Sequence, residues 1–387
     1  MQIIPDTYEM LSTRYGTWGL LLMVTILALF ALQLYYYLGC YSSIPKFRNR
    51  AKNRKREVDG ISVVVVMGND RWYVENVLPR LMKQKFRAFE VVIVTVGAEA
   101  EFLDELEMLK HRYPNLTATK IDEDPRFPIS NKMAYNVGIK AASYENIILT
   151  TTEAMPTSDR WLECMGRGFS TGEVLIAYCG MEQRKGFANK VMRSDRFMMS
   201  VRYLSSAIKG KPFRGIIHNM GFTKSIYFAH KGFDYLNMNL GEDDLFIKRI
   251  ATANNTSIVL HPHATMRQVP WGGLQWWSER QRFYASTFRF YPDYAKNARE
   301  WETGSRLLFF LAAITAMVIM PLEIQIATLA IFIIRLVLVR FSMWRVRQRL
   351  NERRLGWALT LYDLYSPVSD IVNYLHRLVR PAPGVWR

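Results

Sequence analysis

The sequence is poor in cysteine and has no spaced cysteine pair. Its 387 residues include three cysteines, Cys40, Cys164 and Cys179, and none of them forms a Cys-x-x-Cys pair. An odd and sparse set suits a reducing compartment, so we expect buried free thiols rather than a disulfide framework. Zinc-finger spacing, RNA-binding signatures, internal repeats and low-complexity segments are also absent from the sequence, which argues against nucleic acid as a partner.

Acidic residues are scarce compared with basic ones. The chain has 34 Asp and Glu against 51 Lys and Arg, which gives a net charge of +17. The basic residues concentrate in two tracts, residues 46–56 and 345–354, and each tract follows an apolar run. Basic charge in that position indicates membrane topology and membrane lipids as partners rather than nucleic acid.

No charged residue interrupts the run from Trp18 to Cys40, which is about long enough to span a bilayer. Tyr35 to Tyr37 crowd its far end, as aromatic residues at a membrane interface do. No small-residue cleavage site closes the run, which favours a membrane anchor over a signal peptide. With the basic tract directly after it, the positive-inside rule predicts that the chain beyond residue 45 faces the cytoplasm from the inner membrane.

A second apolar region predicts a helical hairpin in the membrane. Its arms are residues 307–320 and 324–343, separated by Pro321-Leu322-Glu323. The first arm is short for a full span, so a re-entrant pair is the alternative. We expect Arg340 to reach the inner interface and the deeper Arg335 to face protein or a polar groove. Residues 355–379 are expected to form amphipathic helices on the membrane surface.

Between these regions the pattern is α/β. Strands are predicted at residues 61–67, 89–96, 116–121, 146–151, 174–181 and 257–260. Helices are predicted at residues 74–85, 99–112, 131–142 and 185–211. Strands that alternate with helices give an open, mostly parallel sheet, and such sheets bind ligands beyond the carboxyl ends of their strands. The candidate binding loops are therefore Gly68–Arg71, Gly97–Glu99 and Thr151–Pro156.

Three consecutive carboxylates, Glu242, Asp243 and Asp244, follow Gly241 and precede an apolar helical run. Acidic residues are favoured at a helix start by the free N–H groups and the dipole, so a well-capped helix is one interpretation. The other is a general base with acidic neighbours in a cleft.

The chain resembles family 2 glycosyltransferases of the GT-A fold, and among them the membrane-anchored members from Bacteroidetes. The resemblance covers roughly residues 60–295 and extends more weakly to the C-terminal hairpin. It is carried by the order and spacing of five segments: ISVVVVMGN, NKMAYNVGIKAA, LTTTEAMPTSDRWL, the Gly210-Lys211-Pro212 turn and GEDDLF. No single segment is decisive.

The resemblance implies an inverting enzyme that transfers a sugar from a nucleotide-sugar donor to an acceptor, here a lipid-linked glycan at the membrane. It assigns the base to Asp243, with Glu242 and Asp244 beside it. It places Asn69, Lys132, Thr151, Glu153, Arg280 and Arg282 at the donor, with Glu153 as a ligand of a divalent metal, Mg²⁺ or Mn²⁺. The plainer alternatives are a turn residue for Asn69, a solvated lysine for Lys132, and lipid headgroup contacts for Arg280 and Arg282.

The sequence departs from the family pattern at two acidic motifs. Thr95-Val96-Gly97-Ala98 stands where the family has Asp-Asp-Gly-Ser, and Thr150-Thr151-Thr152-Glu153 stands where it has Thr-Asp-Ala-Asp. One carboxylate can still help to hold a metal whose other ligands are phosphate and water. His261 and His263 lie where some GT-A enzymes have a further ligand, but hard divalent ions prefer oxygen.

These departures leave two alternatives to a metal-dependent enzyme. One is a non-catalytic GT-A protein that acts as a partner or scaffold of another glycosyltransferase. The other is a metal-independent transferase in which Lys132, Arg280 or Arg282 replaces the ion. A polymer synthase is disfavoured, because the Gln-x-x-Arg-Trp motif is incomplete and the predicted spans are too few for a channel.

The predicted organisation has six parts. They are an anchor (1–45), a basic linker (46–59), the GT-A domain (60–267), aromatic and basic interfacial helices (268–300), the membrane hairpin (301–344) and a cytoplasmic tail (345–387).

Overall fold

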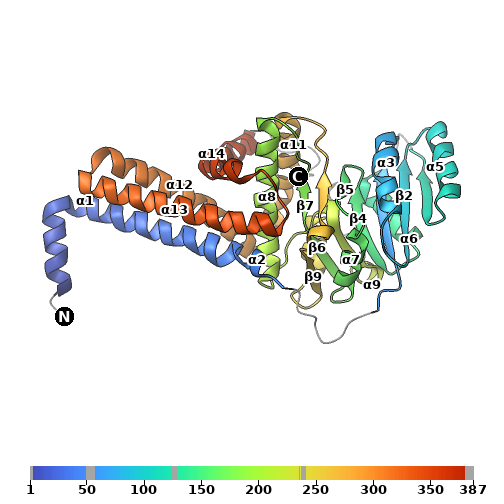
Figure 1. The fold of residues 1–387 in the computed structure, drawn as a ribbon, viewed down its shortest axis with the longest axis horizontal. Helices are drawn as coiled ribbons and strands as arrows, with labels where there is room; N and C mark the ends of the chain where they lie inside the picture. Colours follow the sequence, from blue (N-terminus) through green and yellow to red (C-terminus); the bar gives the residue numbers. More distant parts are fainter. Residues whose placement is uncertain (1–2, 49–56, 124–128, 235, 237–240, 380–387) are drawn as a thin grey trace.

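The computed structural model describes residues 3–48, 57–123, 129–234, 236 and 241–379. A bundle of long helices forms one end of the molecule and an α/β domain the other, with α8 (Phe187–Ile208) between them (Figure 1). Of the first basic tract, only Lys46 and Arg48 lie in the described residues.

The main sheet has seven strands in the order β3-β2-β1-β4-β8-β6-β9. All neighbouring pairs are parallel except those of β8, which runs antiparallel to β4 and β6. The strands are β1 (Ile61–Met67), β2 (Phe89–Val96), β3 (Leu116–Ile121), β4 (Asn146–Thr151), β6 (Val174–Ala177), β8 (Met220–Thr223) and β9 (Thr256–Val259). This confirms the expected α/β architecture with a mostly parallel sheet.

A second sheet of three short strands lies beside the first and was not predicted. Its order is β5-β10-β7, formed by β5 (Ala154–Pro156), β7 (Cys179–Met181) and β10 (Met266–Gln268). The predicted strand at residues 174–181 is therefore two strands in two sheets, separated at Tyr178. An unbroken apolar run is compatible with either partner, so periodicity alone does not reveal where a strand changes sheets.

The shorter helices surround the sheets. They are α3 (Arg71–Asn76), α4 (Leu78–Met82), α5 (Ala100–Arg112), α6 (Asn131–Ala141), α7 (Trp161–Phe169), α9 (Lys224–Ala229), α10 (Asp244–Ile250) and α11 (Leu274–Thr287). The single helix predicted over residues 74–85 is instead the pair α3 and α4. Pro79 lies in the first turn of α4 and has no N–H to donate to the carbonyl four residues earlier, which ends the first helix.

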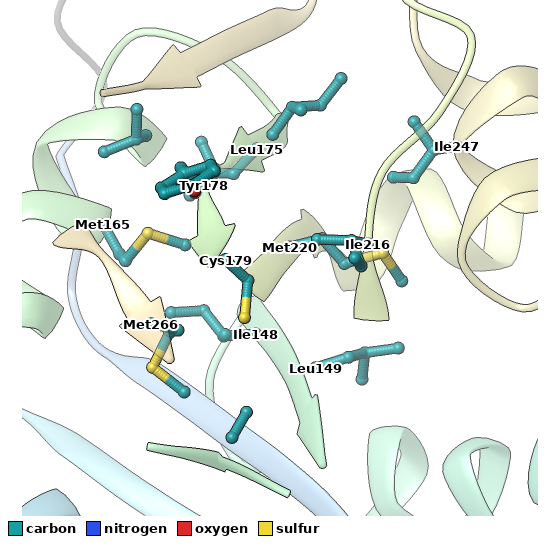
Figure 2. Close-up of a cluster of buried hydrophobic side chains, with 14 of the residues drawn as sticks. Ile148, Leu149, Met165, Leu175, Tyr178, Cys179, Ile216, Met220, Ile247 and Met266 are labelled. Atoms are coloured by element: carbon teal, nitrogen blue, oxygen red, sulfur yellow. The ribbon is translucent and has the colours of Figure 1, made fainter. Parts of the chain in front are cut away.

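The core of the domain lies where the two sheets and α7 meet. Ile148 and Leu149 from β4, Leu175 from β6 and Met220 from β8 are fully buried, and Met266 from β10 packs in the same cluster (Figure 2). Cys164 and Cys179 are buried free thiols, as expected, whereas Cys40 is only partly buried.

In the part of the chain that the structure describes, three helices are long and apolar enough to cross a membrane: Gly16–Lys46, α12 (Asp293–Ile319) and α13 (Leu322–Arg349). The first comprises most of α1 (Ile3–Leu34), a π-helical turn (Tyr35–Tyr41) and α2 (Ser43–Lys46). Because α12 begins at Asp293 rather than near residue 307, its 27 residues extend about 40 Å, which is enough for a full span.

Two aromatic residues predicted at the lipid interface lie inside the protein instead. Tyr36 and Tyr37 are buried, and only Tyr35 is largely exposed. The Tyr37 hydroxyl donates to Asp363 at 3.2 Å, because α14 (Gly356–Val379) packs against the bundle where lipid was expected.

Buried ion pairs hold the helices of the bundle together. Arg335 of α13 contacts Asp363 of α14 at 2.6 Å and donates to Gln33 of α1 at 3.0 Å. This confirms that Arg335 faces protein. Arg306 of α12 joins the same Asp363 at 3.4 Å.

The same charged cluster reaches the α/β domain. Glu302 of α12 is fully buried and accepts a hydrogen bond from Arg202 of α8 at 2.8 Å. Arg340 lies nearer the end of α13, where it donates to Thr360 and stacks on Trp357.

The loop between α13 and α14 forms a second junction with the domain. Glu352 is buried and accepts hydrogen bonds from Tyr178 at 2.7 Å and from Arg193 at 2.6 Å. Arg267 of β10 pairs with the same carboxylate. The three-stranded sheet, α8 and the residue between β6 and β7 are therefore tied to the C-terminal helices.

The ion pairs of Asp363 with Arg306 and Arg335 predict a large effect of substitution at Asp363. Asp363→Asn removes the carboxylate of the buried Arg335 and one of the two carboxylates beside the buried Arg306, so we expect a loss of about 3–5 kcal/mol in stability. Thermal unfolding in detergent measures it. The matched control is Asp370→Asn, at a position on the same helix as Asp363. It removes a partly exposed ion pair with Arg299 of α12 and should cost ~1 kcal/mol or less. Equal melting temperatures for the two variants would contradict the prediction.

Candidate functional site

The loops after β1 and β2 meet through one side chain. Asn69 follows β1, and its Oδ1 accepts a hydrogen bond from the backbone N–H of Glu99 after β2, at 2.9 Å. Asp70 next to it accepts from the N–H of Tyr73 and caps α3. The Asn69 side chain thus fixes the shape of the edge where a ligand of the sheet would lie.

The acidic triplet begins at a backbone turn that requires glycine. Gly241 has φ of 101°, a conformation that side chains with a Cβ rarely adopt. After this turn the three carboxylates point to three different environments, although they are consecutive in the sequence.

The carboxylate of Asp244 is buried, and both of its oxygens are hydrogen-bonded. It is 1% exposed, and its Oδ2 accepts hydrogen bonds from the hydroxyls of Thr287 and Tyr291, each at 2.5 Å. Its Oδ1 accepts the N–H of Leu245 at 2.7 Å. These bonds hold the start of α10 against the segment that joins α11 to α12.

Asp243 caps α10 and is only partly buried. Its Oδ1 accepts the N–H of Asp244 at 2.7 Å, and its Oδ2 lies 3.4 Å from the N–H of Ile217. Burial, together with the charge of Asp244, raises the pKa of Asp243 to about 6, while the nearby Arg214 opposes the shift. Both interpretations of the triplet therefore meet in Asp243: it caps a helix, and its pKa suits a base near neutral pH.

Glu242 has an oxygen without a partner. Its Oε2 is buried and makes no hydrogen bond within the described residues. Burial, and then the charge of Asp243, raise the pKa of Glu242 to about 7. Lys132 lies close enough to oppose this shift, and its ammonium donates to the carbonyl of Leu236. Lys132 is half-buried, which lowers its pKa, so it is not a freely solvated lysine.

A short 3-10 turn joins the triplet to the end of β4. It spans Ile217–Asn219, and Ile217 donates to Asp243 while the ring of the adjacent His218 lies 3.1 Å from the hydroxyl of Thr151. Burial, followed by the charges of Arg196 and Arg280, holds the pKa of His218 well below its usual range. His218 is therefore neutral near pH 7.

Glu153 lies at the same edge and is already held by two donors. Its Oε2 accepts from Gln268 at 2.7 Å, and its Oε1 pairs with Arg280 of α11. Tyr135 donates to the carbonyl of Thr150 at 3.1 Å. It lies close to Glu153 and to the first two carboxylates of the triplet. After burial, the charges of Glu242, Asp243 and Glu153 all raise the pKa of Tyr135. The structure thus brings Asp243, Glu242, Lys132, Thr151, Glu153 and Arg280 to one edge of the sheet.

Two other predicted groups lie elsewhere. Arg282 is two residues beyond Arg280 on α11, but it lines a cavity next to the helical bundle, 3.9 Å from Glu279. His261 contacts the thiol of Cys164 and accepts from the N–H of His263, so this pair serves a local turn. Across the described part of the chain, no group of three or more His, Cys, Asp or Glu residues is placed to hold a metal ion.

Several site residues were missed by the sequence interpretation. Gln268 and Arg196 support Glu153 from β10 and α8, and Arg196 also packs on the rings of Trp277 and Tyr284. Arg214 lies beside the triplet. All are single polar residues in apolar or basic stretches, and no spacing rule marks them.

No protein-family model matches the sequence, and the search of curated proteins found no match. Among solved structures, the mannosyltransferase PcManGT from Pyrobaculum calidifontis, in complex with GDP-Man and Mn²⁺, is similar at a TM-score of 0.53 and 16% identity. The match covers 89% of this chain and 99% of that one. S. aureus TarS 1–349 matches 81% of this chain and 89% of its own at 16% identity, with a TM-score of 0.41 that is too low to support an argument. The first likeness shows the GT-A fold, and at this identity it shows the fold alone.

The buried carboxyl group of Glu242 predicts that the stability of the fold depends on pH. In the fold Glu242 keeps its proton to about pH 7, whereas in the unfolded chain it ionises near pH ~4.3, so stability falls as pH rises through this window. Glu242→Gln should therefore raise the melting temperature at pH 8 and have little effect at pH 5. Glu173→Gln, at an exposed position, is the control. A Glu242→Gln variant that is less stable than the parent at pH 8 would show that the ionised carboxylate is compensated in the fold.

Proposed function

We propose that this chain is an inverting glycosyltransferase of the family 2 type, bound to the inner membrane with its α/β domain in the cytoplasm. It transfers a sugar from a nucleotide-sugar to a lipid-linked glycan. The observation that carries the proposal is the arrangement of Asp243. This carboxylate is poised near neutral pH at the edge of a GT-A sheet. Lys132 lies near the adjacent Glu242, and the Arg280–Glu153 pair lies at the same edge.

Asp243 is the general base of the proposed reaction. A sugar hydroxyl is a weak nucleophile, so its proton must be removed as it attacks the anomeric carbon. A base with a pKa of about 6 is ionised at pH 7 and still basic enough to accept that proton. Asp244, with both oxygens engaged, holds α10 in place, and Glu242 lies beside the base.

Lys132 and Arg280 stabilise the leaving diphosphate. The leaving group gains negative charge as the glycosidic bond breaks, and fixed cations nearby lower the free energy of that state. Arg280 is held in place by Glu153 and by stacking on Trp276 at 5.2 Å. Thr151 and Asn69, at the ends of β4 and β1, line the same edge for the nucleoside and the sugar.

The residues around Glu153 do not fit a metal site built by the protein. Both of its oxygens already accept from protein donors, and a threonine, Thr151, stands at the first acidic position of the family motif. Arg280 lies where a cation would otherwise be needed. The similar mannosyltransferase was solved with Mn²⁺.

The membrane part supports an acceptor that is held in the lipid. The basic tracts at residues 46–56 and 345–354 follow the first and the last span, which orients both toward the cytoplasm under the positive-inside rule. The α/β domain is fixed to these spans through Arg202 and Glu352. An acceptor on a lipid would thus reach Asp243 without leaving the membrane surface.

A non-catalytic GT-A protein is the second candidate. The observation in its favour is that Glu153 is occupied by Arg280 and Gln268. Titration of the purified protein with UDP, GDP and CDP, with and without Mg²⁺ or Mn²⁺, separates the two proposals. Absence of binding to every nucleotide would reject the enzyme, and binding to one of them would support it.

The proposed base predicts a selective loss of the chemical step. Asp243→Asn should lower kcat/KM by about 10²–10⁴-fold while nucleotide binding is retained, since the amide keeps the shape but accepts no proton. In the parent, kcat/KM should fall below about pH 6, where Asp243 becomes protonated. Glu173→Gln is the control. Full activity in Asp243→Asn would exclude this residue as the base.

The arrangement at Glu153 predicts how the enzyme responds to chelation. Transfer should persist in EDTA, because Arg280 supplies the positive charge. Arg280→Gln should weaken binding of the nucleotide diphosphate about tenfold, the effect of losing one charge-assisted contact. The control is Arg289→Gln, at an exposed arginine in the 3-10 turn that follows α11. Activity that disappears in EDTA and returns with Mn²⁺ would assign the charge to a metal instead.

A further inference from the structure

A cavity of about 320 Å³ lies on the side of the triplet that faces the membrane helices. Its walls come from α8, α11, α12, α14 and the last turns of the first span, near Tyr35 and Tyr41. One end of the cavity thus lies beside the C-terminal part of this candidate span. The proposed function uses none of this space.

Two residues of the cavity wall, Tyr291 and Arg214, also lie beside the acidic triplet. Tyr291 lines its wall and donates to Asp244 at 2.5 Å. Arg214 lines the same wall and lies close enough to Asp243 and Asp244 to feel both charges. The cavity therefore extends from the membrane side to the back of the acidic triplet.

The lining carries an excess of positive charge. Its cations are Arg202, Lys209, Lys211, Arg214, Arg282 and Arg299, against two acids, Asp195 and Asp370. Arg202 pairs with Glu302, Arg299 pairs with Asp370, and Arg282 lies 3.9 Å from the partly exposed Glu279. Within the described residues, Lys209, Lys211 and Arg214 have no carboxylate within 4.0 Å. Arg214 feels the charges of Asp243 and Asp244 without an ion pair to either of them.

Arg214 is the most deeply buried of the three cations without an ion pair. Only 6% of it is exposed, and its Nε and Nη2 have no hydrogen-bond partner in the part of the chain that the structure describes. Its guanidinium lies over the ring of Tyr284 at 4.8 Å, which leaves those N–H groups unsatisfied. A buried cation with free donors is costly unless an anion binds it, and a guanidinium matches the geometry of phosphate.

The other cations sit among aromatic rings rather than acids. Lys211 lies over Tyr294 at 5.4 Å, and Lys209 lies over Tyr35 at 5.5 Å and contacts the thiol of Cys40. Both are exposed lysines at the rim, where they can approach a ligand that enters from the membrane. Rings beside cations suit a group that is apolar or sugar-like on one side and anionic on the other.

We propose that this cavity is the acceptor site and binds the phosphate of a phosphate-linked lipid, with Arg214, Arg282, Lys211 and Lys209 as the binding groups. The chain of the lipid leaves toward the membrane helices near Tyr35, and the end to be modified points toward Asp243. This assignment rests on the proposed function for the identity of the lipid as acceptor. The affinity for a lipid phosphate does not depend on it.

The test measures binding of farnesyl phosphate to the purified full chain in detergent, without any nucleotide. Arg282→Gln and Lys211→Gln should each weaken it about tenfold, the effect of losing one charged contact. Arg280→Gln is the matched control: it lies two residues away on the same helix but faces Glu153, so lipid binding should be unchanged. Thermal unfolding of each variant confirms that it is folded.

Two further probes identify what is recognised. Farnesol should bind at least about tenfold more weakly than farnesyl phosphate, because it lacks the charge. Inorganic phosphate should bind more weakly as well, because it lacks the apolar chain. Equal binding of farnesol and farnesyl phosphate would overturn the proposal, and so would equal binding of inorganic phosphate, which would assign the cavity to a free anion.

Nucleotide titrations of the same variants separate this proposal from the one before it. Arg282→Gln should bind nucleotide as the parent does, and Arg280→Gln should not. If the parent binds farnesyl phosphate but no nucleotide, the glycosyltransferase proposal fails and the lipid site remains. If it binds nucleotide but no farnesyl phosphate, the lipid site fails alone.

Discussion

Charges buried among apolar helices must be paired, and this constraint organises the molecule. Asp363 sits between Arg306 and Arg335, and Glu302 sits beside Arg306 and Arg202. These residues come from α8, α12, α13 and α14, so none of the helices can shift without separating a buried ion pair. Since α8 is also a wall of the α/β domain, the same pairs fix the distance between the domain and the membrane helices. The cavity beside Arg214 exists because of this fixed separation.

The acidic triplet shows how one motif can serve several purposes. Asp244 is buried and bonded to two hydroxyls, and Asp243 caps α10. Among the residues that the structure describes, one oxygen of Glu242 has no partner. A cap and a base are therefore not competing interpretations. The helix start that favours a carboxylate also fixes the position of the carboxylate that would act on a substrate.

Local patterns were sufficient for the first four strands of the main sheet and insufficient for the second sheet and the site. The four strands of residues 61–151 were predicted with the bounds that the structure has. In β1 and β2 the signal is a continuous β-branched run, which marks a buried parallel strand. Two errors came from single residues: Pro79 divides a helix, and Tyr178 marks a change of sheet. The burial of Tyr37 was missed because a helix that covers it, α14, lies more than 300 residues away in the sequence.

The candidate site required contacts between distant segments. Glu153 and Arg280 were both identified, but their pairing, which changes the argument about a metal, joins residues 127 positions apart. The separation of Arg280 from Arg282 follows from the helical geometry of α11, since neighbours two apart face different sides. The sequence does not say which structure lies on either side of that helix.

The junction at Glu352 has a practical consequence for making the protein. A water-soluble fragment that ends before α12 would retain Arg193, Arg267 and Tyr178 and lose the one carboxylate that all three contact. Two guanidinium groups would then be left in the interior of the domain without a counter-charge. Residues that look like a membrane appendage thus complete the interior of the α/β domain. Expression of that domain by itself would need a carboxylate supplied in place of Glu352, or apolar side chains in place of its partners.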